Sequence, residues 1–264
     1  MYGFFIRQVK EFIRISLYFY QVIEVIPATI KAILTDRKYK KKGYLQILIQ
    51  ELFHTGVGAI PMVLILGFTV GFILIQLFPF DKISFGIKNI YGYVYATFII
   101  REMAPLFTML IVLVRSTAYI TIRLTQMKID GEIEVLEIMG INPLQYSGAL
   151  NIIAGIINIP ILTIYFILAA FISGVFSAYF FHNVSPVNFS LEIFNSIHAY
   201  DFLIYFIRTI SCGVLIFFIA IYNGLSAPGD ISMIWSRTVR AITTSVIMVI
   251  LFNFLITVFF YGGR

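Results

Sequence analysis

The chain has 264 residues, of which 60% are hydrophobic and only 12% are charged, and its net charge is +6. Soluble domains carry about twice that charged fraction, so the composition excludes a soluble protein and indicates an integral membrane protein. The mean hydropathy of +0.94 agrees. The apolar segments run to about 20 residues without strand-like alternation, which predicts an all-α protein whose helices cross the membrane. The net positive charge is better explained by membrane orientation than by nucleic acid.

The first 42 residues are predicted to lie at the membrane surface. Within residues 1–34, one face of a helix would carry Arg7, Lys10, Glu11 and Arg14, and another would carry apolar residues, which suits an interfacial helix. The segment Asp36–Lys42 is a basic linker, suited to anionic headgroups and equally to a plain topology signal. No cleavable signal peptide is expected, because the N-terminus lacks a continuous apolar core. We therefore divide the chain into a surface segment, 1–42, and a membrane domain, 43–264.

Five membrane spans are predicted, at about 56–79, 93–115, 148–180, 202–222 and 240–261. Lysine and arginine near the span ends set the orientation. Nine of them fall on the side of the N-terminus (Arg37, Lys38, Lys40, Lys41, Lys42, Arg123, Lys128, Arg237 and Arg240) and three on the other (Lys82, Lys88 and Arg264). The N-terminus is thus expected in the cytoplasm and the C-terminus outside. Phe189, Ile193 and Ile197 in the connection 181–201 predict an amphipathic helix on the outer surface.

A charged island, Met127–Tyr146, separates the second span from the third. Apolar residues recur there at roughly helical spacing with acids between them, and Gly140 stands where a residue just past a helix C-terminus would. This predicts a short amphipathic helix on the cytoplasmic side. Its ordinary interpretation is a solvated connecting helix, and its functional one is a docking surface for a basic partner. The candidate docking residues are Met127, Asp130, Ile133, Glu134, Leu136, Glu137, Met139 and Gly140.

Charged residues inside predicted spans are the candidates for a polar site, because burying a charge in hydrocarbon is expensive. Arg101 and Glu102 lie in the second span, and Pro105 should loosen the helix there, because it cannot donate to the carbonyl of Arg101. Asp201 and Arg208 lie in the fourth. We expect Glu102 to pair with Arg208, and Arg101, Glu102 and Arg208 together to leave one positive charge for a lipid phosphate. The alternative is that Asp201 completes a neutral structural network.

The first span contains Gly67 and Gly71 in a small-xxx-small pattern, which permits close helix packing. Bulky apolar residues surround them. Their default interpretation is core packing or lipid contact, and the alternative is a lipid cavity lined by Leu64, Gly67, Phe68, Gly71, Phe72 and Ile75.

No catalytic or cofactor site is predicted in this chain. It has no P-loop and no nucleophile elbow or zinc-protease motif, and His54, His182, His198 and Cys212 are too scattered to form a metal site. If ATP supplies energy, another subunit must bind it.

Four collinear motifs resemble the MlaE-type permease family of lipid-transporting ABC systems. REMAPLFT (Arg101–Thr108) is similar to the family's R-E-L-G-P-V-x-T signature, and Met127–Tyr146 is similar to its cytoplasmic motif. PILT (Pro160–Thr163) resembles its P-L-L-T, and YNG (Tyr222–Gly224) its N-G or Y-G after the fourth span. Three positions depart from the family pattern: Leu150-Asn151 replaces Pro-Arg, Asn253 replaces an Asp, and the glycine-rich loop is shortened at 226–230.

The resemblance implies an interfacial helix plus five spans in the bacterial inner membrane, assembled as a homodimer. It implies two cytoplasmic ATPases that hold the ATP and magnesium, a periplasmic MCE-domain protein and often a STAS-domain protein, with phospholipid as substrate. Met127–Met139 becomes the coupling helix on the ATPase, and Arg101, Glu102, Asp201 and Arg208 match charged positions near the lipid cavity. Two other classes stay open: a stand-alone secondary transporter, for which no internal repeat is visible, and a membrane enzyme acting on lipids.

Overall fold

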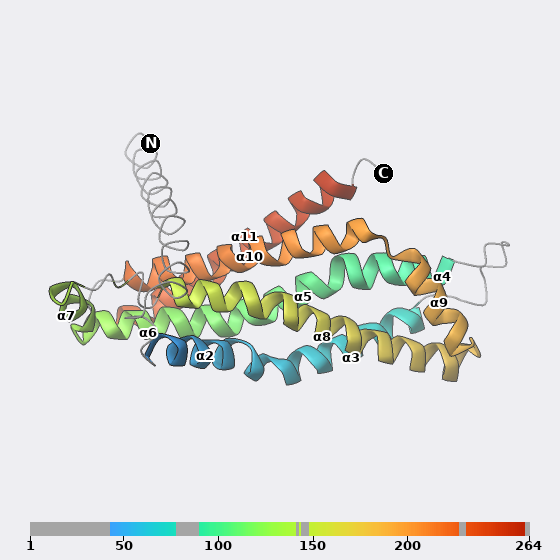
Figure 1. The fold of residues 1–264 in the computed structure, drawn as a ribbon, viewed down its shortest axis with the longest axis horizontal. Helices are drawn as coiled ribbons and strands as arrows, with labels where there is room; N and C mark the ends of the chain where they lie inside the picture. The colour runs from blue at the N-terminus through green and yellow to red at the C-terminus, as the bar shows by residue number, and fades with distance from the viewer. Residues whose placement is uncertain (1–42, 78–89, 141–142, 144–147, 227–230, 262–264) are drawn as a thin grey trace. The chain divides into compact units, whose positions relative to one another are not determined.

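The computed structural model describes residues 43–77, 90–140, 143, 148–226 and 231–261, and within these the chain is helical with no strand (Figure 1). The all-α prediction is therefore confirmed. The predicted interfacial helix and basic linker of residues 1–42 lie outside the described residues. In chain order the elements are α2 (Gly43–Thr55), η1 (Val57–Ala59), α3 (Ile60–Leu77), α4 (Ile90–Tyr95), η3 (Ala96–Met103), α5 (Ala104–Val112), η4 (Leu113–Thr117), α6 (Ala118–Ile129), α7 (Glu132–Ile138), α8 (Ala149–His182), α9 (Pro186–Ser196), α10 (Ala199–Leu225) and α11 (Met233–Tyr261).

Five of these helical stretches are long and apolar enough to cross a membrane, which matches the five predicted spans in order. They are Gln46–Leu77, Gly92–Ile129, Ala149–His182, Ala199–Leu225 and Met233–Tyr261. The second span was predicted to end near residue 115, and the helix that contains it continues past two arginines to Ile129. The helix predicted in the connection 181–201 is confirmed as α9, in which Phe189 and Ile193 are buried, whereas Ile197 lies just after its end. Its place on the outer surface stays a prediction.

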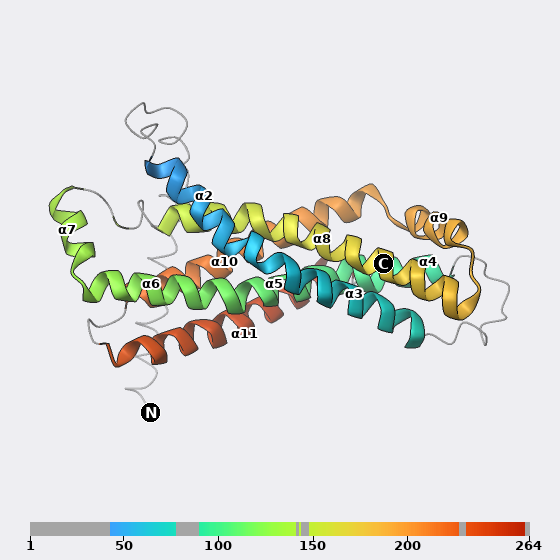
Figure 2. The same ribbon diagram turned by 90° about the horizontal axis from the view of Figure 1, so that it is seen from below.

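The chain divides into two compact units, and α8, α10 and α11 each contribute a part to both. The first unit comprises Met1–Thr55, Leu113–Ile156 and Gly213–Met248, and the second comprises Gly56–Val112, Ile157–Cys212 and Val249–Arg264. Figure 2 shows the same elements from a second direction. The predicted polar residues all belong to the second unit, and the charged island belongs to the first.

In the second unit, α3 packs tightly on α8 through the two glycines of the small-xxx-small pattern. A Cβ at Gly67 would lie 2.7 Å from the backbone oxygen of Phe166, and one at Gly71 would lie 2.4 Å from that of Ala170. The two glycines thus let the backbones of α3 and α8 approach closely, as small-xxx-small patterns do between membrane helices.

The tight α3–α8 contact buries some of the residues that were predicted to line a lipid cavity. Gly67, Gly71 and Ile75 are buried in α3, while Leu64 and Phe68 are 38% and 46% exposed. Phe72 makes an edge-to-face contact with Phe181. A lipid cavity lined by the first span thus stays a prediction. Of the residues named for it, the exposed Leu64 and Phe68 are the ones that could contact a lipid.

A second close approach joins α4 to α9 in the same unit. A Cβ at Gly92 would lie 2.4 Å from the backbone carbon of Glu192, so only glycine fits there. The pKa of the Glu192 carboxyl is raised above its ordinary value, because the effect of burial is larger than that of the hydrogen bond from the backbone of Gly92, which lowers it. The ring of Tyr95 meets Phe189 of α9 at 5.5 Å between centroids. Helix α9 is thereby fixed to the start of the second span.

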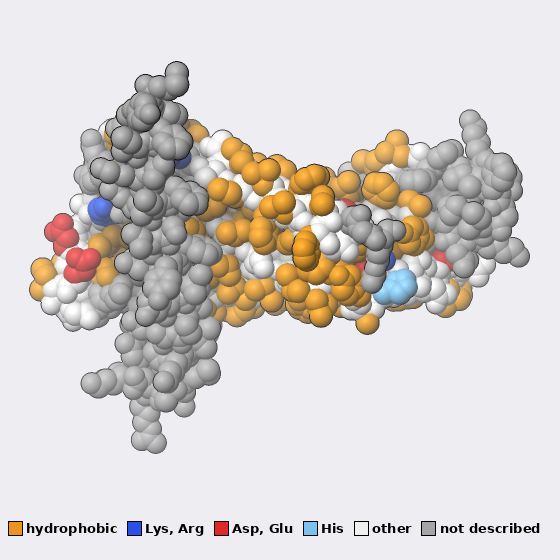
Figure 3. Space-filling view, turned by 90° about the horizontal axis from the view of Figure 1, so that it is seen from above, with side chains coloured by type: hydrophobic (Ala, Val, Ile, Leu, Met, Phe, Trp, Pro, Cys, Tyr) orange, Lys and Arg blue, Asp and Glu red, His pale blue; other side chains and the backbone are white. Residues whose placement is uncertain are grey.

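Hydrophobic side chains cover much of the described surface that is visible in Figure 3. Residues such as Ile65, Phe254 and Phe259 are 67%, 64% and 83% exposed. In water such a surface would be a liability, whereas in a bilayer it is the normal lipid contact.

We predict that Gly71→Ala destabilises the protein by about 1–3 kcal/mol, because the new methyl group meets backbone that cannot move aside. Thermal unfolding in detergent, followed by circular dichroism, measures the loss. The control is Ile73→Ala on the same helix, where the side chain is 46% exposed and little should change. If Gly71→Ala melts with the wild type, α3 is not seated this closely on α8.

Candidate functional site

The polar site of the second unit begins with a break in the helix before Pro105. Residues Ala96–Met103 form a π-helix, in which the backbone N–H of Ala104 reaches the carbonyl of Ile99, five residues back. Proline has no N–H to give to the carbonyl of Arg101 and its ring crowds that carbonyl, so the regular ladder cannot continue. The loosening predicted from the sequence is confirmed, and it leaves the carbonyl of Arg101 available to a side chain.

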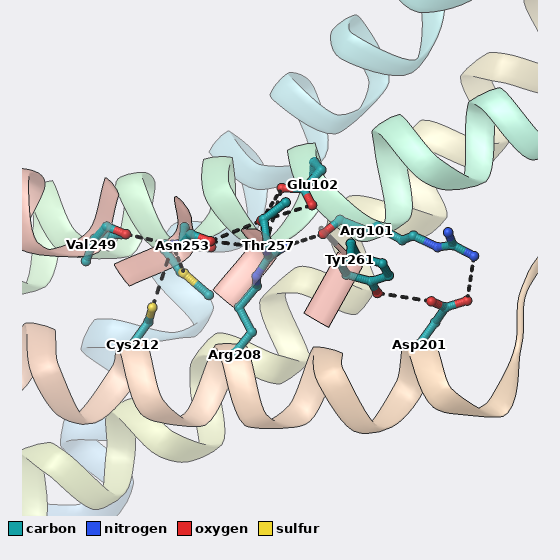
Figure 4. Close-up of polar contacts among 10 residues, drawn as sticks. Arg101, Glu102, Asp201, Arg208, Cys212, Val249, Asn253, Thr257 and Tyr261 are labelled. Atoms are coloured by element: carbon teal, nitrogen blue, oxygen red, sulfur yellow. Dashed lines mark hydrogen bonds and ion pairs between the residues drawn. The ribbon is translucent and has the colours of Figure 1, made fainter. Parts of the chain in front are cut away.

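Arg208 of α10 binds that carbonyl. One guanidinium nitrogen donates to the backbone oxygen of Arg101, and the other donates to the hydroxyl of Thr257 and lies 3.4 Å from a carboxylate oxygen of Glu102 (Figure 4). Thr257 in turn donates to Glu102, at 3.1 Å. The predicted pairing of Glu102 with Arg208 is confirmed. Arg208 thus holds the irregular helix, and its planar fork suits several acceptors at once.

Asp201, in the first turn of α10, has three partners. Its carboxylate accepts from the backbone N–H of His198 at 3.0 Å, while the N–H of Asp201 donates back to the carbonyl of His198 at 2.9 Å. Such reciprocal bonds close the first turn of a helix. The same carboxylate pairs with Arg101 at 3.0 Å and accepts from the hydroxyl of Tyr261 at 3.0 Å. Asp201 therefore caps α10 and joins it to two other helices.

The four charges of this polar cluster, Arg101, Glu102, Asp201 and Arg208, balance. Two arginines face two carboxylates, in the pairs Arg101–Asp201 and Glu102–Arg208. The expectation of one uncompensated positive charge is therefore wrong for this arrangement, because Asp201 supplies the missing anion. The side chain of Arg208 is only 1% exposed, whereas those of Arg101 and Glu102 are 13% and 33% exposed. A buried charge needs such a partner, and here each has one.

Asn253, where the family pattern has an Asp, lies beside the polar cluster and is 3% exposed. Its side-chain nitrogen donates to the carbonyl of Val249 at 2.9 Å and lies near the sulfurs of Met109 and Cys212. The backbone carbonyl oxygen of Asn253 lies 3.4 Å from a guanidinium nitrogen of Arg208. A neutral side chain here keeps the cluster neutral, which explains how this chain accommodates the departure.

Beside the polar cluster lies a cavity of about 280 Å³, lined by parts of α8, α9 and α10 with the irregular helix. Its lining is apolar apart from Arg101, Asp201 and Arg208 and the hydroxyl groups of Tyr205 and Tyr261. Tyr205, which also lines it, donates its hydroxyl to the carbonyl of Pro160 on α8. The PILT motif therefore supplies an acceptor that joins α8 to α10.

The middle of the charged island forms α7 in the first unit, and this helix is bounded by two glycines. Residues 141–142 and 144–146 of the island lie outside the described residues. Gly131 and Gly140 have φ of 74° and 72°, a left-handed conformation that glycine adopts without strain. The predicted C-terminal glycine is thus confirmed. Met127 belongs instead to the preceding helix α6, and Asp130 lies in the turn between the two. The predicted single helix from Met127 to Met139 is therefore two helices, because Gly131 breaks it.

On α7 no residue is buried, and its apolar side chains face outward. Ile138 is 86% exposed, Met139 67% and Val135 55%, while Ile133 and Leu136 are partly covered. Glu132 and Glu134 lie in the first turn, where acids favour the helix dipole. The remaining predicted residue, Glu137, is exposed. Exposed apolar side chains among acidic residues are typical of a surface that binds another protein.

Helix α6, which leads into α7, is fixed to α10 within the first unit. Lys128 donates to the carbonyl of Leu225 at 2.8 Å, and Thr121 donates to that of Ala220 at 3.2 Å. A Cβ at Gly224 would lie 2.8 Å from the Cβ of Leu124. The glycine of the YNG motif therefore allows the close approach that holds the base of α7.

Sequence reasoning missed one further contact, the ion pair between Glu51 of α2 and Arg123 of α6. Glu51 is 2% exposed, and Arg123 also stacks on the ring of Tyr119, with 6.0 Å to its centroid. Arg123 was counted only as a topology signal. The sequence signal for this ion pair was the acidic Glu51 close to the start of the first span, because a carboxylate that is buried there needs a cation as its partner.

The sequence pattern of the family described as Permease MlaE matches residues 48–259. The chain belongs to the MlaE permease family. It is 26% identical to the intermembrane phospholipid transport system permease protein MlaE of Haemophilus influenzae, over 84% of this chain and 85% of that protein. It is 20% identical to a probable ABC transporter permease protein of Pyropia yezoensis, over 81% of each chain. Like these relatives, it is a multi-pass membrane protein, with its apolar helices as the spans.

A further relative is the chloroplast protein TRIGALACTOSYLDIACYLGLYCEROL 1 of Arabidopsis thaliana, which is 22% identical over 86% of this chain and 65% of that protein. The matches to this MlaE-family chain therefore extend across bacteria and plastids at low identity.

We predict that Arg208→Met destabilises the protein by about 3–5 kcal/mol, because it leaves the Glu102 carboxylate without its cation and the Arg101 carbonyl without the guanidinium donor. The double variant Arg208→Met/Glu102→Gln should be less destabilised than the sum of the two single variants, since it removes both charges. Thermal unfolding of the four proteins in detergent measures this coupling. Strictly additive losses would show that the two side chains do not interact.

Proposed function

We propose that this chain is the membrane-spanning subunit of an ABC transporter that moves phospholipid between the inner and outer envelope membranes. The observation that carries the proposal is the family match over residues 48–259. A relative that matches along 85% of its own length is named for intermembrane phospholipid transport. Since the sequence has no nucleotide-binding motif, a separate ATPase subunit, with its ATP and magnesium, must supply the energy.

The ATPase is proposed to dock on α7. The supporting features are its exposed apolar residues Val135, Ile138 and Met139 and the acids between them. An apolar centre with a charged rim is the usual anatomy of a protein interface. The hydrogen bonds from α6 to α10 would carry a displacement of α7 into a membrane-spanning helix of the same unit.

The proposed orientation places α7 and the N-terminus in the cytoplasm and the C-terminus in the periplasm of a bacterial inner membrane. It rests on the lysine and arginine bias of the connections. The further proposed partners are a second copy of this chain, a periplasmic MCE-domain protein and, in many systems, a STAS-domain protein. These follow from the family resemblance. The exposed apolar side chains of α11, such as Phe254 and Phe259, offer a surface that a second copy or lipid could cover.

Within the polar cluster, a headgroup role is proposed for Arg101 and Glu102 only. Their side chains are partly exposed, whereas that of Arg208 is 1% exposed and that of Asp201 is 7% exposed. The two buried members are therefore positioning residues, which hold the irregular helix and the first turn of α10. A lipid phosphate could reach Arg101 by competing with Asp201, since guanidinium groups bind phosphate through paired hydrogen bonds.

We predict that Ile138→Asp together with Met139→Asp abolishes binding of the ATPase, because two carboxylates would have to be desolvated at the interface. The pair is a sharper test than Leu136→Asp, since Leu136 is partly covered and its loss could disturb α7 itself. Co-purification of the tagged chain with its ATPase, and ATP-driven phospholipid transfer in vesicles, measure the effect.

The matched control for the α7 variant is Ile231→Asp, an equally apolar residue that is 71% exposed outside α7. This control should retain the ATPase, and both variants should melt like the wild type. An Ile138→Asp/Met139→Asp protein that still binds its ATPase in full and still transports lipid would show that α7 is not the docking site.

A further inference from the structure

The cavity beside the polar cluster is a site that the proposed function leaves without a ligand. Two apolar stripes face it, each with helical spacing: Ile164, Ile167 and Leu168 on α8, and Phe202, Tyr205 and Phe206 on α10. Residues three and four apart lie on one face of a helix, so each stripe forms a continuous wall. Phe194 of α9 and Pro105 of α5 complete the lining.

Most of the polar groups that line the cavity already have partners, although the buried Nε of Arg208 has no hydrogen-bond partner among the described residues. Arg101 and Tyr261 both bind Asp201, and Arg208 binds the Arg101 carbonyl, Thr257 and Glu102. Because the charges of Arg101, Glu102, Asp201 and Arg208 balance, the polar cluster offers no net charge to a ligand. An occupant with a charge of its own would have to lose its hydration and displace a member of one of these ion pairs, so the cavity favours hydrocarbon.

The rim of the cavity is exposed on helices that are apolar enough to cross the membrane. Leu168 is 51% exposed, Phe202 59% and Phe206 47%, and they belong to the candidate spans Ala149–His182 and Ala199–Leu225. The open side of the cavity is thus expected to meet the acyl chains of the bilayer. Its volume of about 280 Å³ lies just below the usual range of ligand pockets, about 300–1,000 Å³, so it suits a single acyl chain rather than a whole lipid.

We propose that this cavity binds one acyl chain of a membrane phospholipid, which enters sideways between α8 and α10. Ile204 is 2% exposed and lines the cavity, so the tail would reach a depth that lipid on the outer surface of the helices does not. The neighbouring Arg101 and Glu102 would then lie close to the lipid's polar end. This assignment rests on the proposed lipid-transport function and gives that function a tail site within one protomer.

Photo-cross-linking of the full chain tests the site in phosphatidylcholine vesicles with no ATP. One probe is a phosphatidylcholine that carries a diazirine at the end of an acyl chain, and the other carries the diazirine on its headgroup. Mass spectrometry of the cross-linked peptides reports the contacts. The tail probe should label the buried Ile204, and the headgroup probe should not. Ile172, which is 62% exposed on α8, reports ordinary contact with surrounding lipid.

The variant Leu168→Trp narrows the entrance, and Ile167→Phe narrows the cavity more mildly. Both should lose the tail label at Ile204, whereas the control Ile172→Trp should keep it. Equal melting temperatures exclude misfolding as the reason. If the tail probe fails to label Ile204 in the wild type, or labels it equally in both cavity variants, the tail site is wrong. Label without ATP-driven transport would instead contradict only the proposed function.

Discussion

The bond from the guanidinium of Arg208 to the backbone carbonyl of Arg101 is the interaction on which the second unit depends. Pro105 creates the need for it, because a proline at this position leaves that carbonyl without its usual donor. A free carbonyl in hydrocarbon costs several kcal/mol, about as much as folding stability can spare. Arg208 meets the need from α10 and brings a charge that requires Glu102. One proline thus accounts for a polar site inside the membrane.

The neutrality of that site has a consequence for transport. Arg101 and Asp201 are paired, and Asp201 also closes the first turn of α10. A lipid phosphate that drew Arg101 away would leave the carboxylate of Asp201 with fewer partners. Lipid binding and the conformation of α10 would then be coupled, because one ion pair serves both. Such shared use of a charge is a physical route by which a ligand shifts a conformational equilibrium.

Much of this arrangement could be predicted from sequence, because local chemistry determines it. Apolar length gives the five spans, proline chemistry gives the break before Pro105, and the left-handed Gly140 follows from its place after an amphipathic run. Opposite charges on separate spans gave the pairing of Glu102 with Arg208.

What sequence did not predict depends on contacts between distant segments. The helix of the second span continues to Ile129, and within this continuation Arg123 is neutralised by Glu51 from another helix. The neutrality of the polar cluster depends on Asp201 lying next to Arg101, 100 positions away in the chain. Gly67 and Gly71 were recognised as a packing pattern, but only the structure identifies α8 as their partner. A periodic pattern shows that a face exists and leaves open what covers it.

The most direct test of the account is whether ATP drives phospholipid movement through this chain. The chain and its ATPase would be reconstituted into vesicles that hold a radiolabelled phospholipid, with acceptor vesicles outside, and transfer would be followed with ATP and with a non-hydrolysable analogue. The account predicts transfer that requires ATP hydrolysis and is unaffected when ion gradients are collapsed. Transfer that persists without hydrolysis and stops when the gradients are collapsed would contradict it and indicate a secondary transporter.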